Sequence, residues 1–259
     1  MNGTIRKKMS KLIESVWRAN LQLNKAGLTP LTWGNASQID RARGLIAIKP
    51  SGVTYDKLNQ DDIVLTDIKG VKIASNLRPS SDLPSHLALY RSFPSIGAVV
   101  HTHSFFATAF SQACRPVPCL GTTHADYCPI EIPVTDFMTK FQIRTDYEKH
   151  TGEMIVKKIR QSKIDLRQCP FILVAYHGPF AWGKDAAEAV ENVIVLEQIC
   201  QMALWAFFLK KNMKAIPQVL IDKHFFRLRP ADRHRRRRGD RVRGPHRPRR
   251  VGRTARDRA

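Results

Sequence analysis

Residues 96–100 form an apolar run that ends in two histidines, His101 and His103, which are one residue apart. A short run rich in β-branched residues predicts a buried strand. Because side chains alternate along a strand, we expect both imidazoles on one face, about 6.5 Å apart along the strand. Such a pair can bind one metal ion, but alone it also fits one core histidine and one solvent-facing histidine. Further ligands elsewhere in the chain must decide between the two.

The remaining pattern predicts six helices and five more strands that are mixed without strict alternation. Helical spacing of apolar residues predicts helices over residues 11–23, 84–92, 105–113, 145–161, 185–209 and 217–226. Short apolar runs between turn residues predict strands over 45–48, 63–65, 71–73, 130–134 and 171–176. We therefore expect an α/β fold, a single layered domain over residues 1–227 with a central, largely antiparallel sheet flanked by helices.

Two more residues are candidates to complete a metal site. His177 follows the apolar run 171–176, just as His101 follows its own run, and Asp82 precedes the predicted helix 84–92. If these strand ends meet at one edge of the sheet, three imidazoles and one carboxylate form a suitable ligand set for zinc. No local motif fixes their spacing, so the pattern leaves this four-ligand site open.

Three short segments have the chemistry of an anion site. Lys49 precedes Ser51 and Gly52 in one predicted turn. Small polar donors recur in the pairs at 34–35 and 80–81, which are Gly34 with Asn35 and Ser80 with Ser81. Glycine lets main-chain N–H groups approach an anion closely, and serine adds a hydroxyl donor. Each segment alone is also compatible with an ordinary turn. Ser80 and Ser81 directly precede Asp82, which favours a phosphate site beside the metal.

Residues 121–127 carry hydroxyl, imidazole and carboxylate groups in a predicted loop. Asp126 in this segment is a candidate general acid/base. A carboxylate that only shapes the turn through hydrogen bonds to nearby main-chain groups is the alternative, and the pattern alone favours it.

Charge and cysteine content restrict the class of protein. The formal charge is +21, but residues 228–259 hold fourteen arginines against three aspartates, so the rest of the chain is only moderately basic. That balance suits an anionic ligand and requires no nucleic acid. The odd number of cysteines, five, favours reduced thiols, and no signal-like or bilayer-spanning apolar segment is predicted. We expect a cytoplasmic protein with no membrane association.

Together these segments resemble the L-ribulose-5-phosphate 4-epimerase branch of the class II aldolase/epimerase family, from about Trp17 to Arg227. The matching segments are residues 31–35, 48–53, 79–82, 100–104, 121–127 and 177–184. The resemblance implies Zn2+ held by Asp82, His101, His103 and His177, and phosphate held by Gly34, Asn35, Lys49, Ser51, Gly52, Ser80 and Ser81. It implies Asp126 as the acid/base, with Thr122 and Glu148 lining the site. It also implies a homotetramer in which His224 and Arg227 reach a neighbouring subunit's site.

The implied reaction interconverts L-ribulose 5-phosphate and D-xylulose 5-phosphate. The C4 hydrogen of the sugar is not acidic, so the C3–C4 bond is broken and remade after the aldehyde fragment turns over. The family's aldolases typically have a glutamate base where this chain has Asp82, which favours the epimerase over a class II sugar-phosphate aldolase. A third interpretation is a protein without catalytic activity, but the presence of all four metal-ligand candidates argues against it.

The chain departs from the family pattern after Arg227. The resemblance implies a tyrosine in the C-terminal tail as the second acid/base, and it is missing here, since no tyrosine follows Tyr176. Residues 228–259 have too few apolar side chains to fold alone, and we expect an arginine-rich, disordered tail. Three readings remain: a shifted reading frame, which the abrupt change favours; a basic tail that binds nucleic acid or another polyanion; or a solvated extension. If the protein does carry residues 228–259 in place of the family's tail, we expect impaired epimerisation.

Overall fold

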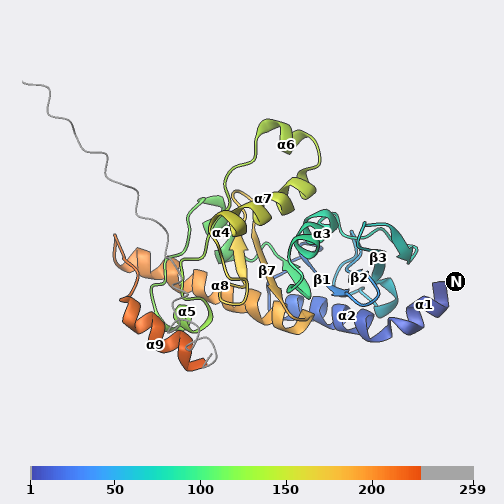
Figure 1. Cartoon of the computed structure of the whole chain (residues 1–259), viewed down its shortest axis with the longest axis horizontal. Coiled ribbons are helices and arrows are strands. Elements are labelled where there is room, and N and C mark those ends of the chain that lie inside the picture. Colours follow the sequence, from blue (N-terminus) through green and yellow to red (C-terminus); the bar gives the residue numbers. More distant parts are fainter. Residues whose placement is uncertain (1, 229–259) are drawn as a thin grey trace, which may run out of the picture.

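A seven-stranded sheet forms the middle of the computed structural model, which describes residues 2–228 (Figure 1). Its strands lie in the order β4-β3-β2-β1-β5-β7-β6, and every ladder between neighbours is antiparallel. The strands are β1 (Asn35–Asp40), β2 (Leu45–Ile48), β3 (Val64–Asp67), β4 (Lys72–Ala74), β5 (Ala98–His101), β6 (Phe171–Leu173) and β7 (Pro179–Gly183). The predicted α/β fold with a largely antiparallel sheet is confirmed.

Helices cover both faces of this sheet. In the described residues the helices are α1 (Asn2–Lys8), α2 (Ser10–Lys25), α3 (Leu83–Ser92), α4 (Phe105–Gln112), α5 (Thr122–Tyr127), α6 (Lys140–Arg144), α7 (Tyr147–Gln161), α8 (Ala186–Leu209) and α9 (Gln218–Leu228), with a short 3-10 turn, η1 (Gln60–Asp62). One core joins the sheet to α2, α4 and α8, and a second joins the opposite face to α3 and α7. Helices α5 and α9 pack against each other beside α8 (Figure 1).

Alternation along β5 assigns its residues to these two cores. Ala98 and Val100 belong to the core with α2 and α8, whereas Val99 belongs to the core with α3 and α7. By the same alternation, His101 points toward α3 and α7. All four residues of β5 are buried, as expected for a strand with neighbours on both edges and helices on both faces.

Several predicted elements are found at their expected positions, whereas other predictions were wrong. The expected strand 45–48 is β2, but the expected strand 130–134 is reduced to isolated bridges at Ile132 and Val134. The expected loop 121–127 is mostly the helix α5. Strands β1 and β7 were not predicted, because the small and polar residues of β1 lack the apolar signal and the short β7 starts with a proline and ends with a glycine. Proline is tolerated at the first residue of a strand.

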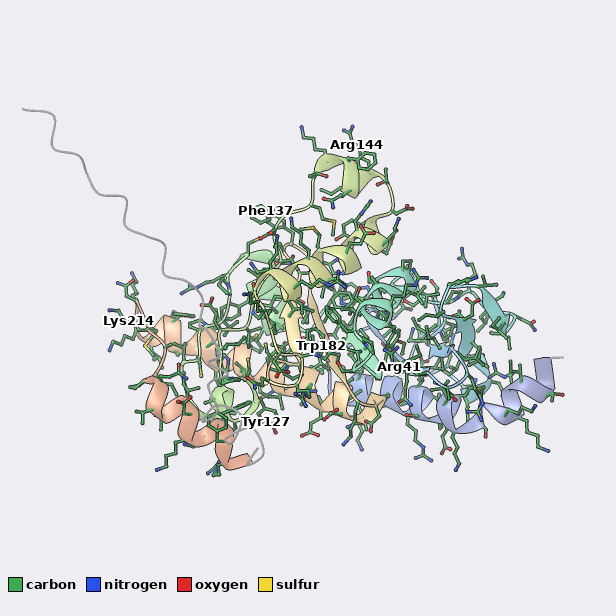
Figure 2. The ribbon with its side chains drawn as sticks, in the orientation of Figure 1. Arg41, Tyr127, Phe137, Arg144, Trp182 and Lys214 are labelled. Atoms are coloured by element: carbon green, nitrogen blue, oxygen red, sulfur yellow. The ribbon has the colours of Figure 1, made fainter. Side chains whose placement is uncertain are left out.

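Helix α8 is the longest helix of the described residues, with 24 residues. Contrary to the prediction from the sequence, α8 is long and apolar enough, by length and composition alone, to cross a membrane. The buried core helices of water-soluble proteins pass the same test, and ten residues of α8 are buried between α2, α4 and β7. Asn192 of this helix donates to the main-chain oxygen of Trp182 on β7 at 2.8 Å. Figure 2 shows Arg144 and Phe137 on the segment around α6 that projects away from the sheet. The predicted arginine-rich tail lies outside the described residues apart from Leu228.

Candidate active site

Three imidazoles converge at the end of β5. His101 is the last residue of this strand, His103 lies two residues beyond it, and His177 lies in the connection between β6 and β7. The Nε2 atom of His101 is 3.1 Å from Nε2 of His103 and 3.0 Å from Nε2 of His177. One ligand atom from each of the three residues falls within 4.8 Å of the others. His177 therefore reaches the other two from a hairpin connection, and not from the end of a long strand as its sequence context suggested.

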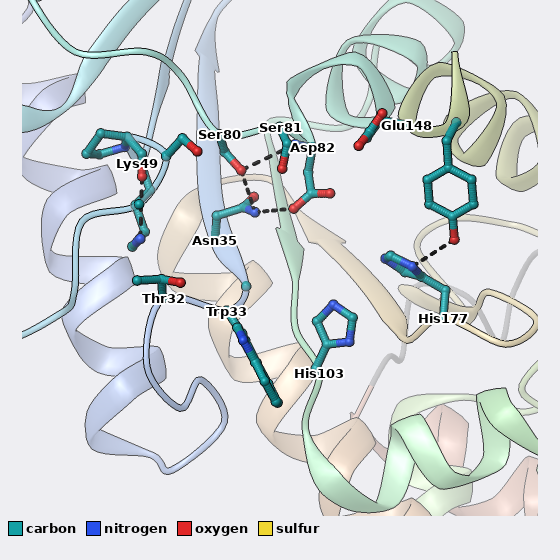
Figure 3. A pocket seen from close by; sticks show the side chains of 15 residues that line it. Thr32, Trp33, Asn35, Lys49, Ser80, Ser81, Asp82, His103, Glu148 and His177 are labelled. Carbon is teal, nitrogen blue, oxygen red and sulfur yellow. Dashed lines mark hydrogen bonds between the residues drawn. The ribbon is translucent and has the colours of Figure 1, made fainter. Parts of the chain in front are cut away.

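Neighbouring groups fix the orientation of two of these rings. Nδ1 of His101 donates to the main-chain oxygen of Pro179 at 2.9 Å, and its ring stacks on Phe180 with centroids 4.3 Å apart. Nδ1 of His177 lies 3.0 Å from the hydroxyl oxygen of Tyr147 (Figure 3). Because Nδ1 of His101 carries the proton, its Nε2 lone pair is directed at the shared centre, and the same holds for His177 in the tautomer in which its Nδ1 donates to the Tyr147 hydroxyl.

Burial favours the neutral form of two of the three imidazoles, His103 and His177. Burial, together with the neighbouring imidazole of His101, lowers the pKa of His103 to about 4 and that of His177 to about 3. Both side chains are therefore unprotonated at neutral pH, which is the form that ligates a metal. The three convergent Nε2 atoms and the Nδ1 contacts of His101 and His177 fit a divalent metal ion with nitrogen ligands.

Asp82 lies beside this cluster, at the N-cap position of α3. Its carboxylate does not cap the helix, and instead Oδ2 accepts a hydrogen bond of 2.6 Å from Nδ2 of Asn35. Burial tends to raise the pKa of Asp82, but the nearby His101 and His86 and the Asn35 hydrogen bond together lower it below its usual value. Asp82 is thus an ionised carboxylate available to the site, although it lies outside the tight group of three nitrogens.

A pocket of about 280 Å³ opens next to the imidazoles (Figure 3). It brings together most of the residues that the sequence singled out. Those that line it are Gly34, Asn35, Lys49, Ser51, Gly52, Ser80, Ser81, Asp82, His103, Glu148 and His177. His101 lies behind this lining and is 1% exposed.

Lys49 is a buried cation in this pocket without a carboxylate partner among the described residues. Its Nζ donates to the main-chain oxygen of Val53 at 2.7 Å and lies 4.8 Å from the centroid of the Tyr55 ring. Burial lowers the pKa of Lys49 to about 8. Nζ also donates to the main-chain oxygen of Pro50 at 3.4 Å. A cation that is desolvated and held only by carbonyl oxygens and an aromatic face attracts an anion strongly. The serine hydroxyls at 51, 80 and 81 line the same pocket.

The remaining predicted residues form a separate cluster between α5 and α9. Nδ1 of His224 lies 3.1 Å from Oδ1 of Asp126, and Nη2 of Arg227 lies 3.3 Å from the same oxygen. Thr122 is the first residue of α5. None of these four residues lines the pocket beside the imidazoles. Within one chain, the acid/base candidate and the metal-ligand candidates therefore do not meet.

Three residues that the sequence analysis did not single out support the site. Tyr147 contacts His177, and Trp33 stands edge-on to His103 with ring centroids 6.0 Å apart. The Tyr55 hydroxyl donates to the main-chain oxygens of Trp33 and Gly34, at 3.0 and 2.9 Å. Trp33 lies in a segment that carried the resemblance, so it could have been found there. The two tyrosines contact residues far away in the sequence and give no local signal.

Comparisons with known sequences place the chain in a family. The profile of the family described as "Class II Aldolase and Adducin N-terminal domain" matches residues 14–204. The chain is 46% identical over 219 residues to an L-ribulose-5-phosphate 4-epimerase, UlaF, of Salmonella paratyphi A. The matched region covers 85% of this chain and 95% of that protein, and the UlaF of Salmonella typhi gives the same values.

Solved structures show the same fold at lower sequence identity. An L-fuculose 1-phosphate aldolase superposes with a TM-score of 0.69 at 23% identity, over 83% of this chain and 94% of that chain. The L-fuculose-1-phosphate aldolase of Thermus thermophilus gives a TM-score of 0.61 at 23% identity, over 78% of this chain and 97% of its own. The likeness to both structures concerns the fold.

Proposed function

This chain belongs to the class II aldolase and adducin family, and we propose that it is a metal-dependent 4-epimerase that interconverts L-ribulose 5-phosphate and D-xylulose 5-phosphate. One observation carries the proposal: the three convergent imidazoles adjoin a pocket that contains a buried lysine and three serines. A metal centre beside an anion pocket suits a substrate that has oxygens to polarise at one end and a phosphate at the other. The 46% identity to the UlaF proteins supports this choice of substrate.

Zinc is the metal that we propose, held by His101, His103, His177 and Asp82. Three neutral imidazoles with one carboxylate are suitable ligands for zinc. When bound, the ion supplies Lewis acidity that stabilises negative charge on the substrate oxygens. The chain's own groups contribute the orientation of the ligands, through the Pro179 carbonyl oxygen at His101 and the Tyr147 hydroxyl at His177.

The pocket around Lys49 is the proposed phosphate site. Lys49 supplies charge, Ser51, Ser80 and Ser81 supply hydroxyl donors, and Gly52 exposes its main chain. Gly34 and Asn35 lie beside them. In the proposed reaction the C4 hydroxyl loses its proton to a base and the C3–C4 bond breaks, which gives an enediolate and glycolaldehyde phosphate. The anchored aldehyde turns its other face, the bond forms again, and an acid returns the proton to the oxygen on C4.

A second copy of the chain completes the proposed site. Asp126 is the proposed acid/base, and it lies with His224 and Arg227 on α5 and α9, away from the pocket of its own chain. A homotetramer in which this cluster and Thr122 face a neighbour's pocket brings the two groups together. Glu148 lines the pocket of its own chain. We place the enzyme in the cytoplasm, where its sugar-phosphate substrate would be available.

The test is an assay that interconverts L-ribulose 5-phosphate and D-xylulose 5-phosphate with and without added zinc. The full chain is compared with a second chain in which residues 228–259 are replaced by the tyrosine-bearing tail of a UlaF protein. We expect zinc-dependent epimerisation in the second chain and weaker epimerisation in the first. Activity in neither chain, although zinc is bound, would overturn the proposal.

An aldolase is the second candidate, and the missing tyrosine favours it. No tyrosine follows Tyr176, so the chain as written lacks the second acid/base that the resemblance implies. Without this acid/base, we expect the C3–C4 bond to be cleaved but the enediolate not to add to the other face of the aldehyde. Release of free glycolaldehyde phosphate in the same assay, without formation of the C4 epimer, identifies this aldolase activity.

A further inference from the structure

Trp33 places a large, half-exposed aromatic ring in the lining of the pocket. The residue lines the pocket and is 51% exposed. Its ring stands edge-on to that of the metal-ligand candidate His103, with centroids 6.0 Å apart and an angle of 65° between the two planes. Figure 3 shows the two rings next to each other. The indole ring therefore contacts the metal side of the site, while about half of the residue stays uncovered.

Hydrogen bonds of the main chain hold Trp33 in place. Its N–H donates to the main-chain oxygen of Pro30 at 3.1 Å. Its main-chain oxygen accepts from the hydroxyl of Tyr55 at 3.0 Å, and Tyr55 is 4% exposed. The next residue, Gly34, has φ +73° and lines the anion side of the pocket. The main chain thus sets the indole ring between the anion side and His103, although the ring is not packed into the core.

Most other groups that line this pocket are polar. Lys49 and three serines supply charge and hydroxyl donors, and the metal-ligand candidates supply nitrogen and oxygen atoms. Tyr147 carries a second large ring, but its hydroxyl lies 3.0 Å from Nδ1 of His177. Trp33 therefore presents the largest apolar surface of the lining. Such a surface, next to a few polar groups, is the part of a pocket that contacts the carbon atoms of a ligand.

The two fragments of the cleaved sugar phosphate differ in the groups that suit them. The enediolate carries oxygens that suit the metal side of the site. Glycolaldehyde phosphate has a phosphate for the anion side and two carbons that extend from it. The C–H groups of a sugar are weakly positive and pack on the face of an aromatic ring, which is negative. Covering the open part of the indole also removes apolar surface from water.

We propose that the two carbons of glycolaldehyde phosphate pack against the indole ring of Trp33, which retains this fragment between cleavage and re-addition. The phosphate lies at Lys49, and the carbons extend along the indole ring toward His103. Trp33 is then a determinant of specificity. A fragment that stays is added again with C4 inverted, whereas a fragment that leaves turns the reaction into an aldol cleavage. The identity of the fragment rests on the proposed function.

The experiment compares an anion that carries the two carbons with one that has none. Binding of glycolaldehyde phosphate and of inorganic phosphate to the metal-loaded, full-length protein is measured by calorimetry. The variants are Trp33→Ala, which removes the ring, and Trp33→Phe, which keeps a smaller one. Phe141→Ala is the matched control, because Phe141 is an aromatic residue that is 71% exposed and does not line the pocket.

We expect Trp33→Ala to weaken the binding of glycolaldehyde phosphate about tenfold and that of inorganic phosphate less than about twofold. Trp33→Phe should lose less than about threefold for glycolaldehyde phosphate, and Phe141→Ala should bind both anions like the wild type. If Trp33→Ala does not fold, as judged by circular dichroism, Trp33→Leu is measured in its place.

The proposal is overturned if Trp33→Ala binds glycolaldehyde phosphate as tightly as the wild type. It is also overturned if both anions lose affinity equally, because the substitution then acts on the anion side of the pocket. None of these measurements depends on epimerase activity. Binding that depends on Trp33 without any epimerisation would contradict the proposed function alone, and epimerisation with binding that is independent of Trp33 would contradict this inference alone.

Discussion

At the scale of single residues, the site depends on which atom of each side chain is already engaged. His101 and His177 each have Nδ1 in contact with an oxygen, which leaves Nε2 for a metal. Lys49 has two carbonyl oxygens and an aromatic face near its ammonium group but no carboxylate partner among the described residues, which leaves its charge for an anion. Each of these assignments predicts what happens when the neighbouring group is removed.

Tyr147→Phe removes the hydroxyl that lies 3.0 Å from Nδ1 of His177. Because an outer hydrogen bond orients a metal-binding histidine, we expect Zn2+ affinity to fall about tenfold while the fold is retained. Chelator competition on the metal-free protein measures the change. Tyr176→Phe is the matched control, since this side chain is 68% exposed and does not line the pocket, and its affinity should equal the wild type. Equal loss in both variants would contradict the assigned role of Tyr147.

Binding of inorganic phosphate should weaken as pH rises above about 8, because burial lowers the pKa of Lys49 to about 8. The ammonium form binds an anion, and it is lost as pH rises through this value, whereas inorganic phosphate stays a dianion above pH 8. The affinity should therefore fall by up to about tenfold per pH unit above that pKa. Lys49→Arg keeps its charge over this range, so its affinity, even if lower at pH 7, should not decline between pH 8 and 9.5. A parallel decline in both proteins would show that another group titrates.

At the scale of elements, the entry of β1 into the sheet decides whether the imidazole cluster forms. Strand β1 pairs with β5 so that Asn35 lies opposite His101, and Gly34 makes the turn that permits this approach. Helix α3 brings Asp82 to the same edge, and Ser85 of this helix donates to the main-chain oxygen of Glu148 on α7. These contacts join β1, β5, α3 and α7 around one pocket.

Gly34→Ala and Gly44→Ala separate close packing from backbone strain. The two glycines have similar φ angles, +73° and +65°, but a Cβ at Gly44 meets nothing within 4 Å, while one at Gly34 lies 2.8 Å from the His101 main-chain oxygen. We expect Gly44→Ala to cost about 1 kcal/mol of unfolding free energy, from strain alone. Gly34→Ala should cost at least about 3 kcal/mol because main chains must also separate. Urea unfolding measures both, and equal costs would contradict the packing argument.

At the scale of the whole molecule, the two groups of proposed catalytic residues lie apart within one chain. The pocket with the imidazoles and Lys49 lies between the sheet and helices α3 and α7, whereas Asp126 lies with His224 and Arg227 on the α5–α9 pair. Exposed aromatic residues such as Phe105 and Phe208, at 75% and 79%, leave apolar surface that a second copy could cover.

Mixed oligomers test whether these halves meet between subunits. His103→Ala removes a metal-ligand candidate, and Asp126→Asn removes the acid/base candidate, so each homo-oligomer should be nearly inactive. When the two variants are co-expressed, the His103→Ala chain still offers Asp126 to a neighbour with intact imidazoles. For sites shared by two subunits and random assembly, we expect about a quarter of the wild-type epimerase activity to return. Mixing after separate purification, without subunit exchange, is the control. No recovery in verified mixed oligomers would contradict a shared site.

The sequence by itself determined the local elements and the types of chemistry. Periodic apolar residues predicted α2, α3, α7 and α8, because the buried side chains of a helix recur along the sequence with the period of the helix. Histidine after an apolar run and serine with glycine in a turn indicated a metal and an anion. The tertiary structure alone decided which of these groups meet. His177 reaches His101 across 76 residues of chain, and Asn35 reaches Asp82 across 47. Such contacts depend on strand order, register and helix packing, which the local spacing of residues does not encode. The separation of Asp126 from the pocket of its own chain likewise follows from the fold and could not be predicted from the sequence.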